Sequence, residues 1–427
     1  MAKDMVLCER GGETEVLGEK ELRKGLCGAL KRLGTHKRVL VIPPDFSRLH
    51  SRAGLLTNLI GKHYGPRLAA VLPALGTHAP MRPAQIDAMF QGMRRELFVT
   101  HDWRNDVVTL GTVPAALIRR LTNGKASFDW PVQVNKLLVE GKFDLILSVG
   151  QVVPHEVVGM ANHAKNIFVG TGGAQAINLS HYVGVVCGME QTMGRIATPV
   201  RHMFDFAMEA FGYKLPPVVY VQTVVAPHEG ETVVRGLYIG PGRTAFEKAA
   251  ALSQKVNITT VPHPLKKCVA YLDPAEFKST WVGNKAIYRT RMAMADGGEL
   301  IVIAPGVKTF GEDALMDKLI RRHGYLGTEK TLAAMRSDLA LNENLGAAAH
   351  LIHGSSEGRF SITYAAGGLS RDEIEKAGFR YADVADLLRR YPPDTLAPGF
   401  NALDGEDIYY VPNPALGLWS TEGRLKS

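Results

Sequence analysis

The sequence predicts an α/β fold of two domains with mainly parallel sheets. Three observations support this prediction. Short runs of β-branched and aliphatic residues end in polar, glycine-containing loops, as buried strands of a parallel sheet do. Segments with helical periodicity lie between these runs, so that strand and helix alternate along the chain. The chain has 427 residues, 46% of them hydrophobic, which is enough for more than one core.

The first three predicted strands each lead into a polar loop. A strand is predicted over 39–42, a second ends near Leu72, and a third covers 145–149. Amphipathic segments at 52–64 and 82–97 predict helices between them. A helix between two strands is the usual crossover between parallel neighbours, so these strands are expected to run in the same direction.

The alternation resumes after a proline-containing segment. A helix is predicted over 244–255, and Pro262 and Pro264 predict a linker over 261–267. Beyond it we expect strands within 298–306 and 359–367, and helices over 313–323 and 328–340. The expected organisation is an N-terminal catalytic and cofactor-binding domain at 1–262, a C-terminal α/β domain at 263–400, and a tail at 401–427 for which a return to the N-terminal domain is one option.

Charge and cysteine usage exclude several classes of protein. The net charge is +8, but the basic residues are spread out, so no nucleic-acid partner is expected, and a basic cleft for small anions or a solvated basic surface explains the charge. No apolar run approaches about 18 residues and no secretory signal stands at the start, so no membrane partner is expected. The four cysteines are far apart. We therefore expect a soluble protein in a reducing, cytoplasmic setting.

Reactive side chains follow the carboxyl ends of the predicted strands. Asp45 and Arg48 follow the first strand, His78 follows the second, and His155 follows the third. In open α/β sheets, ligands bind in the crevice beyond these ends. We expect these four side chains to converge on one pocket.

The segment 155–181 carries three histidines and a lysine among glycines and small residues. Histidine is the commonest metal ligand and titrates close to neutral pH. His155 and His163 do not have the spacing of an HExxH zinc site, and no cysteine pair is near, so a self-contained zinc site is not expected. His163 remains open between a structural and a functional role. The glycine-rich turn at 170–173 lacks a complete phosphate-binding motif and fits an anion-binding turn or a turn without a ligand equally well.

Taken in order, these motifs resemble the nickel-dependent lactate racemase family over most of the chain. An Asp-x-Ser-Arg loop stands at 45–48 and a Gly-Thr-His loop at 76–78. Lys165 follows His155 by 10 residues, and His181 follows Lys165 by 16. Lys285 stands early in the second predicted domain. The ordered set is specific, whereas each motif alone would be weak.

The resemblance implies a cofactor, which we expect in the cleft between the two domains. In this family it is a nickel-pincer nucleotide, a modified pyridinium mononucleotide derived from nicotinate. By position, Lys165 would be its covalent attachment and His181 the nickel ligand. Asp45, Ser47 and Lys285 would contact the cofactor. Proteins that build the cofactor are implied partners.

The resemblance also implies a reaction. The C2 centre of a small 2-hydroxy acid would be inverted by reversible hydride transfer to the cofactor, through a 2-keto acid. His78 and His155 would be the two acid/base groups. Arg48 would bind the substrate carboxylate, and Lys285 would add a second positive charge. Asp45 would also orient a histidine or Lys165.

Two departures from the family pattern bear on the substrate. Val282, beside Trp281, stands three residues before Lys285, where many members have glutamine. The stretch 160–164 replaces a glycine-serine-rich one. Loss of a polar donor next to an aromatic ring predicts a substrate broader, bulkier or less polar than lactate. The alternatives are a sugar-acid 2-epimerase of the same family, a non-catalytic cofactor- or ligand-binding homologue, and an unrelated zinc hydrolase.

Overall fold

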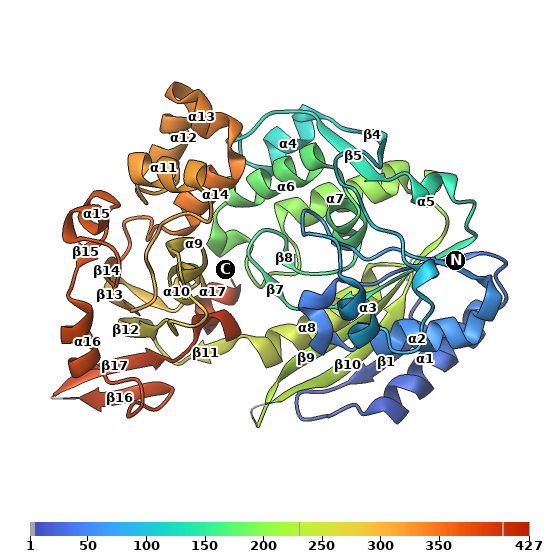
Figure 1. Ribbon diagram of the computed structural model, residues 1–427, viewed down its shortest axis with the longest axis horizontal. Helices are drawn as coiled ribbons and strands as arrows, with labels where there is room; N and C mark the ends of the chain where they lie inside the picture. The colour runs from blue at the N-terminus through green and yellow to red at the C-terminus, as the bar shows by residue number, and fades with distance from the viewer. Residues whose placement is uncertain (1–4, 230, 404, 427) are drawn as a thin grey trace. The chain divides into compact units, whose positions relative to one another are not determined.

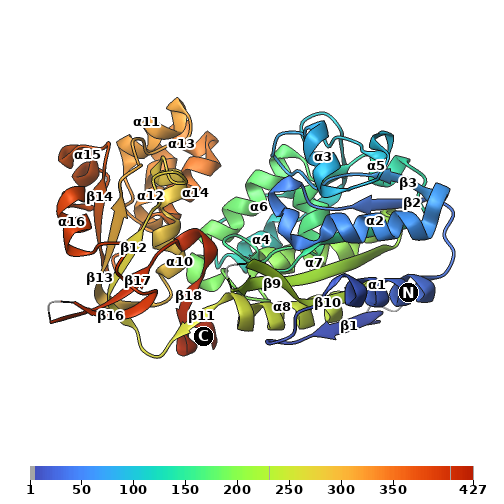
Figure 2. The same cartoon turned by 60° about the horizontal axis from the view of Figure 1, so that its bottom comes forward.

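The computed structural model describes residues 5–229, 231–403 and 405–426, which belong to two compact units (Figure 1). Unit 1 contains Met1–Cys187 and Gln191–Asn257, and unit 2 contains Gly188–Glu190 and Ile258–Ser427. Each unit has a six-stranded sheet with helices packed on it (Figure 2). The predicted fold class, two α/β units with mainly parallel sheets, is confirmed.

The sheet of unit 1 is parallel at one side and antiparallel at the other. Its strand order is β1 (Cys8–Gly11), β10 (Glu231–Gly240), β9 (Val218–His228), β6 (Leu145–Gln151), β2 (Val39–Ile42) and β3 (Leu68–Val71). The pairs from β9 to β3 are parallel, whereas β10 pairs antiparallel with both β9 and β1. The carboxyl ends of β2, β3 and β6 therefore lie at one edge, as the sequence predicts.

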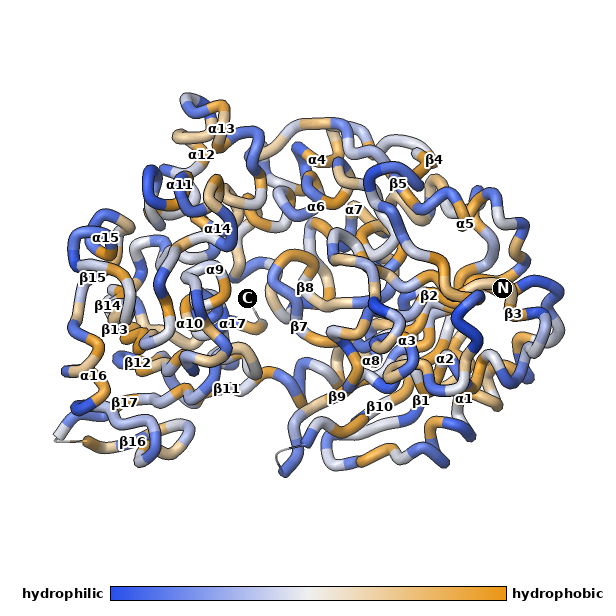
Figure 3. Tube along the Cα trace, in the orientation of Figure 1, coloured by the Kyte–Doolittle hydropathy of each residue, from blue (hydrophilic) through white to orange (hydrophobic). Residues whose placement is uncertain are grey.

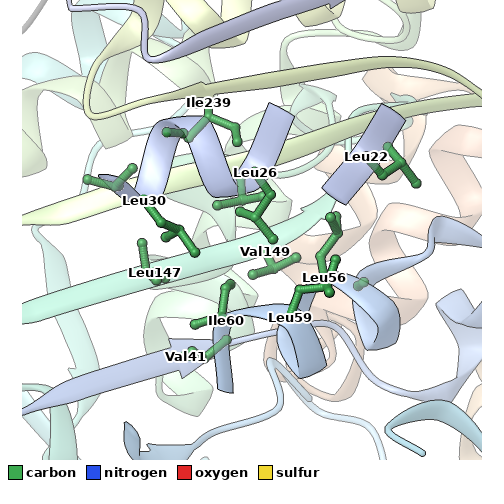
Figure 4. Packing of buried hydrophobic residues seen from close by; sticks show 14 of the residues in the cluster. Leu22, Leu26, Leu30, Val41, Leu56, Leu59, Ile60, Leu147, Val149 and Ile239 are labelled. Carbon is green, nitrogen blue, oxygen red and sulfur yellow. The ribbon is translucent and has the colours of Figure 1, made fainter. Parts of the chain in front are cut away.

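The core of unit 1 lies between this sheet and the helices α1 (Glu19–Leu33) and α2 (Ala53–Tyr64). Figure 4 shows leucines of both helices packed on Val41 of β2 and on Leu147 and Val149 of β6. The spacing of Leu22, Leu26 and Leu30 puts one face of α1 on the sheet. The opposite face of β9 and β10 is covered by α8 (Arg243–Asn257).

The remaining elements of unit 1 flank the sheet. They are α3 (Pro83–Met89), β4 (Val107–Val113), α4 (Ala115–Leu121), β5 (Trp130–Asn135), α5 (Leu137–Glu140), β7 (Pro154–His155), β8 (Gly159–Met160), α6 (Ala174–Val186) and α7 (Pro199–Phe211). Short 3-10 turns lie at Phe46–Ser51, Gly65–Arg67, Arg95–Leu97 and Gly212–Lys214, and a π-helical turn lies at Asn166–Gly170. A further 3-10 turn, Met189–Gln191, has its first two residues in unit 2 and its last in unit 1. The helix predicted over 82–97 ends at Met89, because Phe90 leaves helical geometry and Gly92 takes a positive φ of 77°.

The sheet of unit 2 is parallel except at one edge. Its order is β15 (Arg380–Tyr381), β14 (Ser361–Ala366), β13 (Met294–Ala304), β12 (Leu265–Tyr271), β17 (Glu406–Val411) and β16 (Gly399–Leu403). Only β16 is antiparallel to its neighbour among these described strands. A separate parallel pair joins β11 (Thr259–Val261) to β18 (Trp419–Thr421).

Short helices surround this sheet. They are α9 (Thr280–Gly283), α10 (Lys285–Thr290), α11 (Ala314–His323), α12 (Thr328–Ser337), α13 (Leu339–Glu343), α14 (Leu345–His353), α15 (Arg371–Lys376), α16 (Val384–Arg390) and α17 (Glu422–Lys426), with a 3-10 turn at Pro414–Leu416. Across the described parts of the chain, no helix has the length and apolar character needed to cross a membrane.

Two details differ from the expected organisation. The predicted linker 261–267 is largely strand, because β11 ends at Val261 and β12 begins at Leu265. Pro262 and Pro264 occupy the short gap between these strands, where no ladder hydrogen bond is lost. The segment 401–427 is grouped with unit 2, where β17 pairs with β12, and not with unit 1.

Candidate active site

A cavity of about 300 Å³ opens at the carboxyl ends of β2, β3 and β6. Its lining includes Asp45, Ser47, Arg48, His78, His155, Lys165 and His181. The structure thus brings together the candidate residues of unit 1, although they span much of its length. Every residue that lines the cavity belongs to unit 1, whereas Lys285 is the first residue of α10 in unit 2.

Asp45 and His78 form a hydrogen-bonded pair at the mouth of the cavity. His78 Nδ1 lies 2.5 Å from Asp45 Oδ2, with side chains 62% and 11% exposed. The other oxygen, Oδ1, accepts from the amide and hydroxyl of Ser47 at 3.0 and 2.5 Å. Burial opposes ionisation of Asp45, but these bonds from His78 and Ser47 outweigh it and lower the pKa of the carboxyl. An ionised carboxylate only accepts, so His78 donates through Nδ1 and keeps the lone pair of Nε2.

Backbone geometry places His78 opposite the glycine-rich turn. Gly76 has a positive φ of 55°, which favours glycine, and its amide donates to the carbonyl of Gly170 at 2.9 Å. An added Cβ on Gly170 would lie 2.6 Å from the Cβ of Ala74. The glycine-rich turn therefore provides close backbone packing against the His78 loop, a role that its sequence alone did not reveal.

His155 is held in the opposite tautomer. It ends β7, which forms a small hairpin with β8, and its Nδ1 accepts from the amide of Val157 at 3.1 Å. The neutral ring therefore carries its proton on Nε2. Burial lowers the pKa of His155 strongly, Glu156 opposes the shift, and Lys165 adds to it.

His181 is oriented as metal-binding histidines usually are. It lies on α6, and its Nδ1 is 2.7 Å from the carbonyl oxygen of Ile177. A carbonyl only accepts, so Nδ1 carries the proton and Nε2 keeps its lone pair. Burial lowers the pKa of His181, which favours the neutral ring that binds metals.

Lys165 precedes the π-helical turn at Asn166–Gly170 and lines the cavity. Burial is the main cause that lowers its pKa to about 8, and the nearby guanidinium of Arg48 lowers it further. Near pH 8, a large fraction of the amine is therefore neutral and able to act as a nucleophile. Arg48 and Lys165 also give the cavity positive charge for an anionic ligand.

Comparison with known proteins finds a domain family that resembles part of unit 1. Residues 26–194 match the lactate racemase N-terminal domain. This part of the chain is therefore similar to the N-terminal domain of lactate racemases. No curated protein matches its sequence.

Two solved structures are similar in fold over nearly the whole chain. A structural-genomics protein from Thermotoga maritima has a TM-score of 0.76 at 25% identity, covering 97% of this chain and 100% of that chain. The lactate racemase apoprotein from Thermoanaerobacterium thermosaccharolyticum has a TM-score of 0.70 at 17% identity, covering 98% of this chain and 95% of that chain. Because the identity to this lactate racemase is low, the match shows a similarity of fold alone.

Other residues that line the cavity were missed as candidates. Asn162, Asn166 and Gln151 contribute polar side chains to the lining. Asn166 donates to Ser148 and to the carbonyl of Val149, both at 3.3 Å. The sequence offered one signal, the polar pair Asn162–His163 just before Lys165, but not the backbone conformation of that pair.

Proposed function

We propose that the protein is a racemase or epimerase that inverts the C2 centre of a 2-hydroxy acid with a nickel-pincer nucleotide. The observation that carries this proposal is that one cavity is lined by His78 and His155, by Lys165 with its lowered pKa, and by His181, whose Nε2 can bind a metal. The match of residues 26–194 to the lactate racemase N-terminal domain supports the reaction type. The substrate, the mechanism and the residue roles are part of the proposal.

The residues present fit such a cofactor. His181 offers one free nitrogen, and among the described residues no three His, Cys, Asp or Glu side chains are grouped to hold a metal. The other donor atoms of a metal bound by His181 would therefore come from a cofactor and not from protein side chains. A metal-containing nucleotide would supply such donor atoms. Lys165 supplies an amine for covalent attachment.

The side chains have distinct tasks in the proposed reaction. When bound, the cofactor supplies the hydride-accepting chemistry that protein side chains lack. His78 takes the proton of the C2 hydroxyl at Nε2, while Asp45 holds the ring and stabilises the imidazolium that forms. The neutral ring of His155 donates a hydrogen bond from Nε2 to the same oxygen when the substrate is bound by its other face, and His78 returns its proton to that oxygen. Arg48 binds the substrate carboxylate with its fork of N–H donors.

Lys285, the first residue of α10 in unit 2, remains a predicted contact of the substrate or cofactor. A second positive charge would bind the substrate or hold the keto oxygen. Beside it on α9, Trp281 packs on His350 with ring centroids 4.4 Å apart. The aromatic ring beside Val282 is the reason for predicting a bulkier or less polar 2-hydroxy acid than lactate, and the sugar-acid epimerase remains the alternative.

Intact-protein mass spectrometry tests the proposal. The chain is co-expressed with the enzymes that build the cofactor, and wild type is compared with Lys165→Ala. An added mass and bound nickel on wild type, both absent from the variant, are expected. Chiral chromatography of lactate, phenyllactate, malate and gluconate then identifies the substrate.

The control is a lactate racemase that is known to acquire the cofactor, expressed in the same host. If that control acquires the adduct and this chain does not, the racemase proposal fails and a non-catalytic binding protein becomes the better account. Bound zinc without an added nucleotide mass would instead favour the hydrolase.

A further inference from the structure

Two consecutive residues just before Lys165 adopt the left-handed backbone conformation. Asn162 has a φ of 72° and His163 a φ of 57°. Both are buried, at 2% and 4% exposure, so they are not at a surface turn. Residues with a Cβ disfavour this conformation, and histidine tolerates it less readily than glycine does. Among the described residues, no other two neighbouring non-glycine residues share it. The surrounding structure must hold such a pair in place.

Arg201 of α7 anchors the backbone on both sides of Ala161. Its Nη2 donates to the carbonyl of Met160 at 2.5 Å, and its Nη1 donates to the carbonyl of Asn162 at 3.3 Å. The guanidinium is fully buried and lies 4.4 Å from the ring centroid of Phe246. Burying a cation is unfavourable unless its donors are used. These charge-assisted bonds give the buried guanidinium a structural role at this segment.

Aromatic rings hold His163 from two sides. Its ring lies 4.0 Å from that of Tyr220 at 37°, and 5.0 Å from that of Phe246 at 28°, measured between centroids. Burial lowers the pKa of His163 well below its ordinary value, so the ring is neutral and acts as a flat aromatic group. Phe246 thus packs against both Arg201 and His163 and joins the two anchors.

The chain after the pair is also fixed. The amide of Asn166 donates to the carbonyl of His163 at 2.9 Å, and the side chain of Asn166 bonds to β6. The π-helical turn at Asn166–Gly170 then begins, a rare geometry that is frequent at functional sites. Lys165 is therefore bracketed by an anchored residue on each side.

We infer that Asn162, His163 and Arg201 form a clamp that positions the amine of Lys165 in the cavity for attachment of the cofactor. This inference rests on the proposed function for the identity of the attached group. The clamp residues are positioning residues. Without the clamp, the lysine would relax out of its enclosed site and its amine would be protonated at neutral pH.

The reactivity of Lys165 in the cofactor-free protein tests the clamp directly. Trace acetylation with acetic anhydride over a range of pH, followed by peptide mass spectrometry, reports how the amine titrates. The charged groups around it are Arg48 and Arg201, which lower its pKa, and Glu156 and Asp45, which raise it. Replacing Arg201 would itself remove a charge, so the informative changes are at Asn162 and His163.

The key comparison is Asn162→Val with Asn162→Gly. Valine is strongly disfavoured in the left-handed region, whereas glycine adopts it freely. Near pH 8 we expect Asn162→Val to slow acetylation of Lys165 about fivefold or more relative to Lys62, because a rise of about one pKa unit from about 8 lowers the neutral fraction of the amine by about that factor. Asn162→Gly should stay within about twofold of wild type. Asn123→Val is the matched control, because Asn123 has a φ of 52° at an exposed position.

A second pair covers the case in which Asn162→Val does not fold. His163→Phe keeps a flat ring between Tyr220 and Phe246, and His163→Gly keeps the backbone but removes the ring. We expect slow acetylation in the glycine variant and near wild-type acetylation in the phenylalanine variant. Wild-type titration of Lys165 in folded Asn162→Val or His163→Gly would overturn the clamp.

The test separates the clamp from the proposed function. If these variants slow acetylation but no adduct forms during co-expression, the clamp stands and the cofactor proposal fails. If wild type and Asn162→Val acquire the adduct at equal rates, the clamp fails and the cofactor proposal stands.

Discussion

The Nδ1 atom of His78 lies 2.5 Å from Oδ2 of Asp45. This contact fixes the ring orientation and the tautomer, although the side chain of His78 is 62% exposed. A histidine held in this way can accept a proton at Nε2 while the carboxylate stabilises the resulting charge. The pair therefore makes His78 the better prepared base in the proposed site.

Replacing Asp45 by asparagine tests this role. Asp45→Asn keeps the side-chain volume but removes the negative charge that stabilises a protonated His78. We expect kcat to fall about 10²- to 10³-fold in the cofactor-loaded enzyme, with a small change in KM. The rate of racemisation, followed by chiral chromatography, measures the effect.

Ser47→Thr is the matched control, because it keeps a hydroxyl that can donate to the other oxygen of Asp45. It should lower kcat much less. An Asp45→Asn variant with kcat within about threefold of wild type would remove Asp45 from the proposed mechanism.

The three histidines of the cavity should differ in tautomer. His78 and His181 carry their protons on Nδ1, whereas His155 carries its proton on Nε2. Nitrogen NMR of ¹⁵N-histidine-labelled, cofactor-free protein near pH 7.5 should show two of these rings protonated on Nδ1 and one protonated on Nε2. His→Gln variants assign each signal to its residue. If His155 is protonated on Nδ1, its bond from Val157 is absent in solution and its proposed donor role loses its basis.

The strands were predictable where burial is complete on both faces. The run 39–42 is fully buried and forms β2 with the predicted bounds, and 145–149 falls within β6. The hairpin of β9 and β10 was missed, because its inner part is as apolar as a parallel strand and its partner is set by tertiary contacts. Figure 3 shows the trace of this hairpin becoming hydrophilic towards the end of β9 and the start of β10.

The sequence predicted which residues line the site better than it predicted their tautomers and backbone conformations. Strand ends and motif spacing indicated that Asp45, His78, Lys165 and His181 would meet. The tautomers depend on backbone partners such as Ile177, which side-chain motifs do not specify. The clamp was hidden because Arg201 lies 36 residues beyond Lys165, and the positive φ of His163 is imposed by packing.

Arg48 should set the reactivity of Lys165. After burial, the charge of Arg48 is the largest cause that lowers the pKa of this amine to about 8. Arg48→Met should raise that pKa, so that less neutral amine is present near pH 8 and trace acetylation becomes slower. Arg48→Lys keeps the charge and should stay close to wild type. Equal or faster acetylation in Arg48→Met would show that Arg48 does not act on Lys165.

His350 in unit 2 should make folding sensitive to acid. It is 6% exposed, stacks on Trp281 and lies 2.9 Å from the hydroxyl of Tyr325. Burial lowers its pKa to about 3, with His353 adding to the shift. Between about pH 6.5 and this value, the unfolded chain binds a proton that the folded chain does not. The contribution of neutral His350 to the free energy of unfolding is therefore complete above about pH 6.5, and it is lost as the pH drops towards 3.

Urea unfolding at a series of pH values measures this effect in His350→Gln. The variant keeps a polar partner for Tyr325 and is expected to lose about 1–2 kcal/mol near pH 7.5 through poorer packing. Its stability should then fall less steeply than that of wild type below about pH 6.5, by at most about 5 kcal/mol in total. His228→Gln, at an exposed position, should leave the slope unchanged. Equal slopes in wild type and His350→Gln would mean that His350 is already protonated in the folded protein or that unit 2 opens before it titrates.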